Sequence, residues 1–239
     1  MKPSETSIVI VGGSSGIGFA CARRLAQMGY RVVITARTQA RVDETLAKLA
    51  HDIAGQPLDY ADRPGIAAAF ARIGAFDHLV LAGAGPATWG AFESLDRDAV
   101  QAAFASKFWG YFDTLQAALP QLAKQGSITL VSGAAARVAL PGTVGLAAVN
   151  GAIERMGVTL AKELAPRRVN VVSPGLVDTP AYDWMAPEAR QAMLDGAAAK
   201  LRVQRYGTPD DIAQAVAFLM TNPYVTGSIL DVDGGVRLG

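Results

Sequence analysis

The sequence is poor in the residues that disulfides and metal clusters need. Its 239 residues include a single cysteine, Cys21, and two histidines. One cysteine excludes an internal disulfide framework and a cysteine-based zinc site, and it fits a reducing compartment. We therefore expect no metal site and a cytoplasmic location.

Charge and long apolar runs are scarce as well. Lys and Arg total 22 and Asp and Glu total 21, which leaves a net charge of +1. This balance gives no support to binding of nucleic acid or of a charged membrane surface. No apolar run reaches the ~18 residues of a membrane-spanning helix, and residues 8–11 are too few for a signal peptide. We expect neither nucleic acid nor membrane as a partner.

Apolar and small residues, in contrast, are abundant. Hydrophobic residues make up 51% of the chain and 25 residues are glycine, so a large core is possible and global disorder is excluded. Short apolar runs alternate with helical patterns, which indicates an α/β domain with a parallel, doubly wound sheet and helices on both faces. We expect one domain, residues 1–239. The predicted strands are 7–11, 31–35, 76–82, 127–131, 169–172 and 227–232, and the predicted helices are 19–28, 41–49, 95–122, 145–164, 188–201 and 210–220.

A glycine-rich loop separates the first predicted strand from the first helix. Gly12 allows the tight turn, Gly16 allows a pyrophosphate to approach the backbone, and Gly18 allows the helix to pack closely on the strand. The N-terminus of that helix attracts phosphate. An ordinary glycine-rich turn is the alternative, but the strand–loop–helix context favours a dinucleotide site in a Rossmann-type domain. The predicted cofactor-binding residues of this loop are Gly12, Ser14, Ser15, Gly16, Ile17 and Gly18.

The end of the second predicted strand indicates which dinucleotide binds. Folds that bind NAD usually place Asp or Glu here, to accept a hydrogen bond from the ribose 2′-hydroxyl. This chain has Arg37 instead, with no carboxylate before Asp43. A guanidinium favours a 2′-phosphate, although a solvated surface arginine is the alternative. We expect NADP(H).

Several motifs, in order along the whole chain, resemble those of the short-chain dehydrogenase/reductase family. Residues 11–18 are similar to the family's Thr-Gly-x-x-x-Gly-x-Gly loop, with Val11 in place of Thr. The other similar segments are Leu58-Asp59, Ala82-Gly83-Ala84-Gly85, Pro174-Gly175 with Thr179, and the C-terminal signature in 207–213 and 226–235. The resemblance implies further cofactor contacts at Asp59, Tyr60, Ala82, Gly83, Ala84, Pro174, Gly175, Val177 and Thr179.

The resemblance fails at the catalytic residues. The family uses Tyr-x-x-x-Lys on the helix after the fifth strand, a serine before it, and an asparagine on the preceding helix. Here Leu146 and Asn150 stand at the Tyr and Lys positions, Gly133 at the Ser position, and Lys107 at the Asn position. Because residues 112–181 contain no tyrosine, no shift of the alignment restores the motif.

The family's Tyr donates a proton to the substrate oxygen, which leucine cannot do. Lys107 and Asn150 look like an exchange of the family's Asn and Lys between facing helices. If both point into one pocket, Lys107 binds the cofactor ribose, stabilises an oxyanion or donates the proton; a structural pair or a surface lysine is the alternative. Ser132 and Tyr182 complete the catalytic candidates, with a strand-end hydrogen bond as the alternative for Ser132.

Two classes of function stay open. One is an NADP(H)-dependent oxidoreductase with an atypical active site, acting on a small carbonyl or alcohol, and the family favours it. The other is a catalytically silent NADP(H)-binding sensor or oligomer partner. The resemblance also implies a substrate lid at about 180–205, and a homodimer or homotetramer formed through the two long helices.

Overall fold

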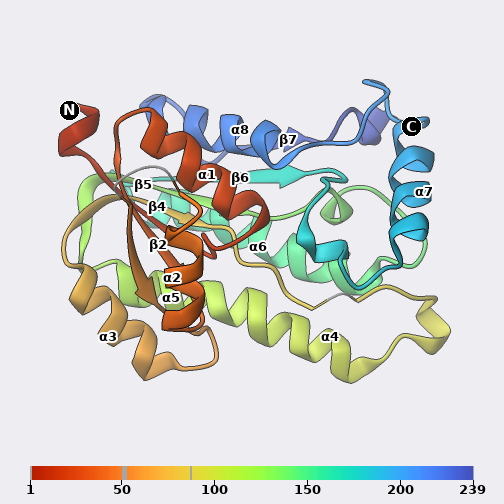
Figure 1. Cartoon of the computed structure of the whole chain (residues 1–239), viewed down its shortest axis with the longest axis horizontal. Helices are drawn as coiled ribbons and strands as arrows, with labels where there is room; N and C mark the ends of the chain where they lie inside the picture. Colours follow the sequence, from red (N-terminus) through yellow and green to blue (C-terminus); the bar gives the residue numbers. More distant parts are fainter. Residues whose placement is uncertain (1, 50–52, 87, 239) are drawn as a thin grey trace.

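The central feature of the computed structural model, which describes residues 2–49, 53–86 and 88–238, is one parallel sheet (Figure 1). Its seven strands run in the order β3-β2-β1-β4-β5-β6-β7, so the chain winds outward in both directions from β1. The strands are β1 Ser7–Val11, β2 Arg31–Ala36, β3 Ile53–Pro57, β4 Phe76–Leu81, β5 Leu122–Val131, β6 Arg168–Pro174 and β7 Ile229–Val232. This order confirms the predicted doubly wound, Rossmann-type α/β fold.

Helices cover both faces of the sheet (Figure 1). They are α1 Gly16–Gln27, α2 Gln39–Leu46, α3 Arg63–Ile73, α4 Arg97–Ala103, α5 Gly110–Ala118, α6 Val144–Glu163, α7 Pro187–Ala198 and α8 Pro209–Thr221. Among the helices of the described residues, none is long and apolar enough to cross a membrane.

Alternating side chains of each strand supply two separate cores. On β1, Ile8 and Ile10 belong to the core beneath α1 and α8, whereas Val9 and Val11 belong to the core beneath α3, α5 and α6. Strand residues point alternately to opposite faces, so a strand buried on both faces must be apolar throughout. This explains the continuous apolar run at residues 8–11.

The sequence patterns missed one strand and one helix. The strand β3 contains a glycine and a proline and only one large apolar side chain, Ile53, so no strand pattern marks it. In α3 the buried face consists of Ile66, Ala69 and Phe70, and the surrounding alanines blur its period. A usable signal was present: Asp62 caps α3 by accepting the Gly65 N–H at 3.0 Å, two residues before Pro64 in the first turn.

The long helix predicted over 95–122 is interrupted and ends early. Between α4 and α5, residues Phe104–Trp109 form a π-helical segment, and α5 ends at Ala118. The chain then turns at Pro120, and β5 begins at Leu122. The guanidinium of Arg167 donates to the carbonyl oxygen of Leu119, at the C-cap of α5, and to those of Leu122 and Ala123 at the start of β5. The other predicted elements are confirmed with shifted ends.

The half-buried Tyr60 packs against Gly83, just after β4, and Gly110, the first residue of α5. A Cβ atom built on Gly83 would lie 2.4 Å from Tyr60 Oη, and one built on Gly110 would lie 2.8 Å from the Tyr60 ring. Tyr111, whose ring centroid is 6.2 Å from that of Tyr60, donates its hydroxyl to the carbonyl oxygen of Leu81 at 2.8 Å. The two tyrosines therefore fix the loop that follows β4.

Candidate active site

The glycine loop has the geometry that close approach to a phosphate requires. Gly12 (φ +82°) and Gly16 (φ +50°) adopt left-handed backbone conformations, which glycine accepts without strain. A Cβ on Gly12 would lie 2.8 Å from the Gly83 nitrogen, and one on Gly18 would lie 2.1 Å from the Gly12 oxygen. Ser15, at the N-cap of α1, makes no side-chain capping bond, so the first-turn N–H groups stay available to an anion.

The other predicted cofactor residues surround this loop, because the carboxyl ends of parallel strands meet at one edge of a sheet. Thr179 packs on the loop: a Cβ built on Gly16 would lie 3.4 Å from Thr179 Cβ. Arg37 and Asp59 are exposed just after β2 and β3. The remaining positions lie at or just after the carboxyl ends of β3, β4 and β6; they are Tyr60, Ala82, Gly83, Ala84, Pro174, Gly175 and Val177.

The charge of Arg37 is not neutralised by a neighbour in the described part of the chain. Its guanidinium is exposed and forms no ion pair there, whereas Arg41, one turn further along, pairs with Glu44 at 2.7 Å. An unpaired guanidinium just after β2 can donate two parallel hydrogen bonds to a phosphate group.

Lys107 and Asn150 lie together, which excludes the surface-lysine alternative and is compatible with a shared pocket or a structural pair. The half-buried Lys107 projects from the π-helical segment, and its Nζ donates to Asn150 Oδ1 at 2.7 Å and to the Ser132 carbonyl oxygen at 3.1 Å. Burial lowers the pKa of Lys107 from 10.5 to about 8. Segments of π-helix are frequent at functional sites. Among the described residues, two of the three N–H groups of the Lys107 ammonium have acceptors, which leaves one N–H group available as a donor.

The Ser132 hydroxyl is engaged away from this ammonium. Its single hydrogen has two acceptors within reach, Glu154 Oε1 at 3.0 Å and the Val172 carbonyl oxygen at 3.3 Å, which is the strand-end arrangement that the sequence left as an alternative. Gly133 follows it, and a Cβ there would lie 2.8 Å from Asn150 Nδ2. Asn150 thus occupies the space that a larger residue at 133 would need.

Sequence reasoning missed a buried carboxylate next to this cluster. Glu154 is 5% exposed, and its Oε2 lies 3.1 Å from Arg137 Nε. Arg137 in turn pairs with Asp231 on β7, and Asp231 pairs with Arg237. The signal was spacing, since Glu154 lies four residues after Asn150 and so faces the same side of α6.

Tyr182 does not join this cluster. It lies in the 3₁₀ turn Pro180–Tyr182 after β6, and its burial raises the pKa of the phenol. Among the described residues, no hydrogen bond connects it to Lys107, Ser132 or Asn150. The structure therefore brings together three of the four catalytic candidates. The described residues also contain no group of three or more His, Cys, Asp or Glu able to hold a metal ion.

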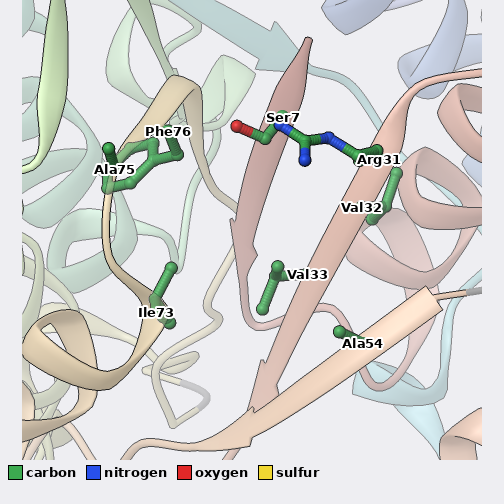
Figure 2. A pocket seen from close by; sticks show the side chains of 8 residues that line it. All are labelled: Ser7, Arg31, Val32, Val33, Ala54, Ile73, Ala75 and Phe76. Atoms are coloured by element: carbon green, nitrogen blue, oxygen red, sulfur yellow. The ribbon is translucent and has the colours of Figure 1, made fainter. Parts of the chain in front are cut away.

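A pocket lies at the opposite edge of the sheet and is separate from this site. Figure 2 shows it at the amino ends of the strands, with the Arg31 side chain reaching across toward Ser7. Its volume is about 280 Å³, and Val33, Ala54 and Phe76 line its apolar part. Ligands of open α/β sheets bind at the carboxyl ends of the strands, so we assign no role to this pocket.

Comparison with known proteins places the chain in a family. The family model of enoyl-(acyl carrier protein) reductases matches residues 11–237. An oxidoreductase of Methylorubrum extorquens without an assigned substrate is 35% identical, with 96% of each chain covered. The 3-oxoacyl-[acyl-carrier-protein] reductase of Thermotoga maritima is 31% identical, covering 95% of this chain and 96% of its own. The chain belongs to the short-chain dehydrogenase/reductase family of oxidoreductases.

A solved structure supports the same assignment. A small-chain dehydrogenase crystallised in complex with NADPH superposes with a TM-score of 0.86 at 37% identity, covering 98% of this chain and 99% of its own. The strand order and the glycine loop described above agree with that match. The family is therefore established by sequence and by fold together.

Proposed function

We propose that this protein is an NADP(H)-dependent oxidoreductase that reduces a small carbonyl compound or oxidises the corresponding alcohol. The observation that carries the proposal is the Lys107 ammonium, held by Asn150 and the Ser132 carbonyl at the edge of the sheet where the glycine loop lies. A charged donor at that place can act on a substrate oxygen.

The residues present fit a phosphorylated dinucleotide. The glycine loop and the uncapped N-terminus of α1 would hold the pyrophosphate, and Arg37 would bind the 2′-phosphate. Asp59 would lie near the adenine, and Thr179, packed on Gly16, would lie toward the nicotinamide. Support for the choice of NADP(H) comes from Arg37 and from the NADPH bound to the 37% identical dehydrogenase.

Lys107 supplies what the missing phenol would otherwise supply. When bound, the reduced nicotinamide provides a hydride for the carbonyl carbon. The positive charge of Lys107 stabilises the developing oxyanion, and its free N–H group transfers a proton to that oxygen. The neutral amine then regains a proton from water. Asn150 and the Ser132 carbonyl orient the ammonium, because each accepts one of its hydrogens. In this proposal the Ser132 hydroxyl and Tyr182 do not take part in the proton transfer.

The pH dependence of reduction follows from the lowered pKa of Lys107. The acid form is the protonated ammonium, so carbonyl reduction should be fastest below about pH 8 and should fall with each further pH unit. Alcohol oxidation needs the neutral amine and should rise through the same range. The measurement is kcat between pH 6 and pH 10 in both directions. A profile that stays flat to pH 10 contradicts the assignment.

The choice of cofactor is tested at Arg37. Replacing Arg37 by Asp removes a charge-assisted bond and sets two negative charges against each other, so the Kd for NADPH should rise roughly 30-fold or more. The Kd for NADH should stay equal or fall, because a carboxylate accepts the 2′-hydroxyl. Binding is followed by fluorescence of the reduced nicotinamide. The control is Arg72→Asp, an exposed arginine near the end of α3, and equal affinities of the unmodified protein for both dinucleotides would refute the preference.

Turnover separates the enzyme from the silent cofactor-binding protein. Purified protein with NADPH and a panel of aldehydes, ketones and acyl thioesters should consume NADPH, as followed by its absorbance. Tight NADPH binding without consumption across the panel would favour the sensor. Leu146 stands at the position of the family's catalytic Tyr and cannot donate a proton. A protein that binds NADPH without turnover is therefore the relevant alternative.

A further inference from the structure

One arginine joins α7 to the segment that covers the glycine loop. We call residues 176–183 the strap. Arg190 Nη2 pairs with Asp178 Oδ1 and donates to the Thr179 carbonyl oxygen at 3.1 Å, and Nη1 donates to Asp183 Oδ1 at 2.5 Å. A single guanidinium therefore holds three points of the strap.

The strap is anchored from its other side as well. The Asp178 N–H donates to the Gly207 carbonyl oxygen at 3.0 Å, and Val177 forms an isolated parallel bridge with Gly207. Between the two anchors lies Thr179, whose Cβ is 3.4 Å from a Cβ built on Gly16. What fixes Thr179 therefore also fixes how closely the strap packs on the glycine loop.

The Thr179 carbonyl is held by two donors. It accepts the Tyr182 N–H at 3.2 Å as well as Arg190 Nη2. Without Arg190, the short turn at Pro180–Tyr182 would be the remaining local restraint on this carbonyl, and two carboxylates would stand unpaired on one side of the cleft. Isolated surface ion pairs contribute little, but a planar guanidinium that binds two carboxylates and a carbonyl imposes geometry that a lysine cannot.

We propose that Arg190 is a positioning residue for the cofactor: through Asp178 and Thr179 it sets the strap against the glycine loop, and thereby fixes the nicotinamide half of the dinucleotide. The inference rests on the proposed binding of NADP(H). It goes beyond that proposal because it assigns the ordering of one half of the cleft to a residue on α7 that lies outside the sequence motifs. The adenosine half is held from β2 and β3 and does not depend on Arg190.

Two substitutions of opposite charge separate geometry from electrostatics. Arg190→Met removes a positive charge and Asp178→Asn removes a negative one, and both abolish the same ion pair. If Arg190 acts by positioning, both variants raise the Kd for NADPH about tenfold. If it acts only by its charge on the phosphates, the two variants shift the Kd in opposite directions, and the proposal is overturned.

The probe for the half-site is adenosine 2′,5′-bisphosphate, which lacks the nicotinamide. Its Kd should stay within about twofold in both variants, whereas an equal loss for probe and NADPH overturns the assignment to the nicotinamide half. Arg23→Met, which breaks an exposed ion pair between α1 and Asp210, is the matched control and should change neither Kd.

Amide hydrogen exchange of the cofactor-free protein tests the strap without any ligand. Residues 176–183 should exchange faster in Arg190→Met and Asp178→Asn than in the unmodified chain, and unchanged exchange in both variants overturns the proposal. If the unmodified protein binds no dinucleotide, the proposed function fails, while faster exchange in the variants still shows that Arg190 restrains the strap. The two failures are thus distinguishable.

Discussion

Replacing Lys107 by methionine should lower kcat for carbonyl reduction by about 100-fold or more while NADPH still binds. Positioned proton transfer contributes about 10²- to 10⁴-fold to rates, and stabilisation of an oxyanion adds to it. In this cluster we assign both proton donation and oxyanion stabilisation to Lys107, because Asn150 Oδ1 and the Ser132 carbonyl oxygen act as acceptors of its hydrogens. Steady-state kinetics with saturating NADPH measure the loss, and NADPH fluorescence verifies that the variant still binds.

Two further variants define which role Lys107 plays. Lys107→Arg keeps the charge but has no accessible proton to give, so it should retain oxyanion stabilisation and lose the limb of the pH profile near pH 8. Lys162→Met, at an exposed position on the same helix as Asn150, is the control and should leave kcat unchanged. A Lys107→Met variant with the kcat of the unmodified protein would remove the chemical basis of the proposed function.

Arg137→Ala should destabilise the protein by about 3 kcal/mol, the largest effect that we expect on folding. It leaves Glu154, whose side chain is 7% exposed, without its cation, and an unpaired buried charge costs about 3–5 kcal/mol. The hydrogen bond from Ser132 offsets part of this cost, which places the value at the lower end. Urea denaturation followed by circular dichroism gives the free energy of unfolding.

A second substitution tests whether the buried charge is the cause. Glu154→Leu in the Arg137→Ala background removes the unpaired carboxylate and should recover most of the lost stability, because apolar replacements of buried ion pairs are often neutral. Arg23→Ala breaks an exposed pair and should cost less than about 1 kcal/mol. If the double variant is no more stable than Arg137→Ala, packing and not charge explains the loss.

The sequence predicted the fold well because the core strands carry their own signal. Residues 8–11 are apolar on both faces, and each face meets a different set of helices. The edge strand β3 and the helix α3 carry no such signal, since one is half exposed and the other buries mostly small residues. The end of the helix predicted over 95–122 was wrong, since the Leu119 carbonyl at the C-cap of α5 accepts from Arg167, which lies more than forty positions away in sequence.

The site was predicted where contacts follow from strand ends and helix faces. The family resemblance raised a shared pocket for Lys107 and Asn150 as one alternative, and the structure shows the two side chains in contact at 2.7 Å. Spacing could not predict which way the Ser132 hydroxyl points, because that depends on Glu154 and Val172 on other elements. The roles of these residues in catalysis stay predictions.

The packing of Tyr60 restricts which substitutions can occur at positions 83 and 110. Its ring fills space that glycine at 83 and at 110 leaves open, so a side chain gained at Gly83 or at Gly110 collides with a phenol that is already in place. A side chain at position 83 therefore requires the Tyr60 phenol to move or a smaller residue at position 60. Among related sequences, we expect residues larger than glycine at position 83 to occur together with a residue smaller than tyrosine at position 60.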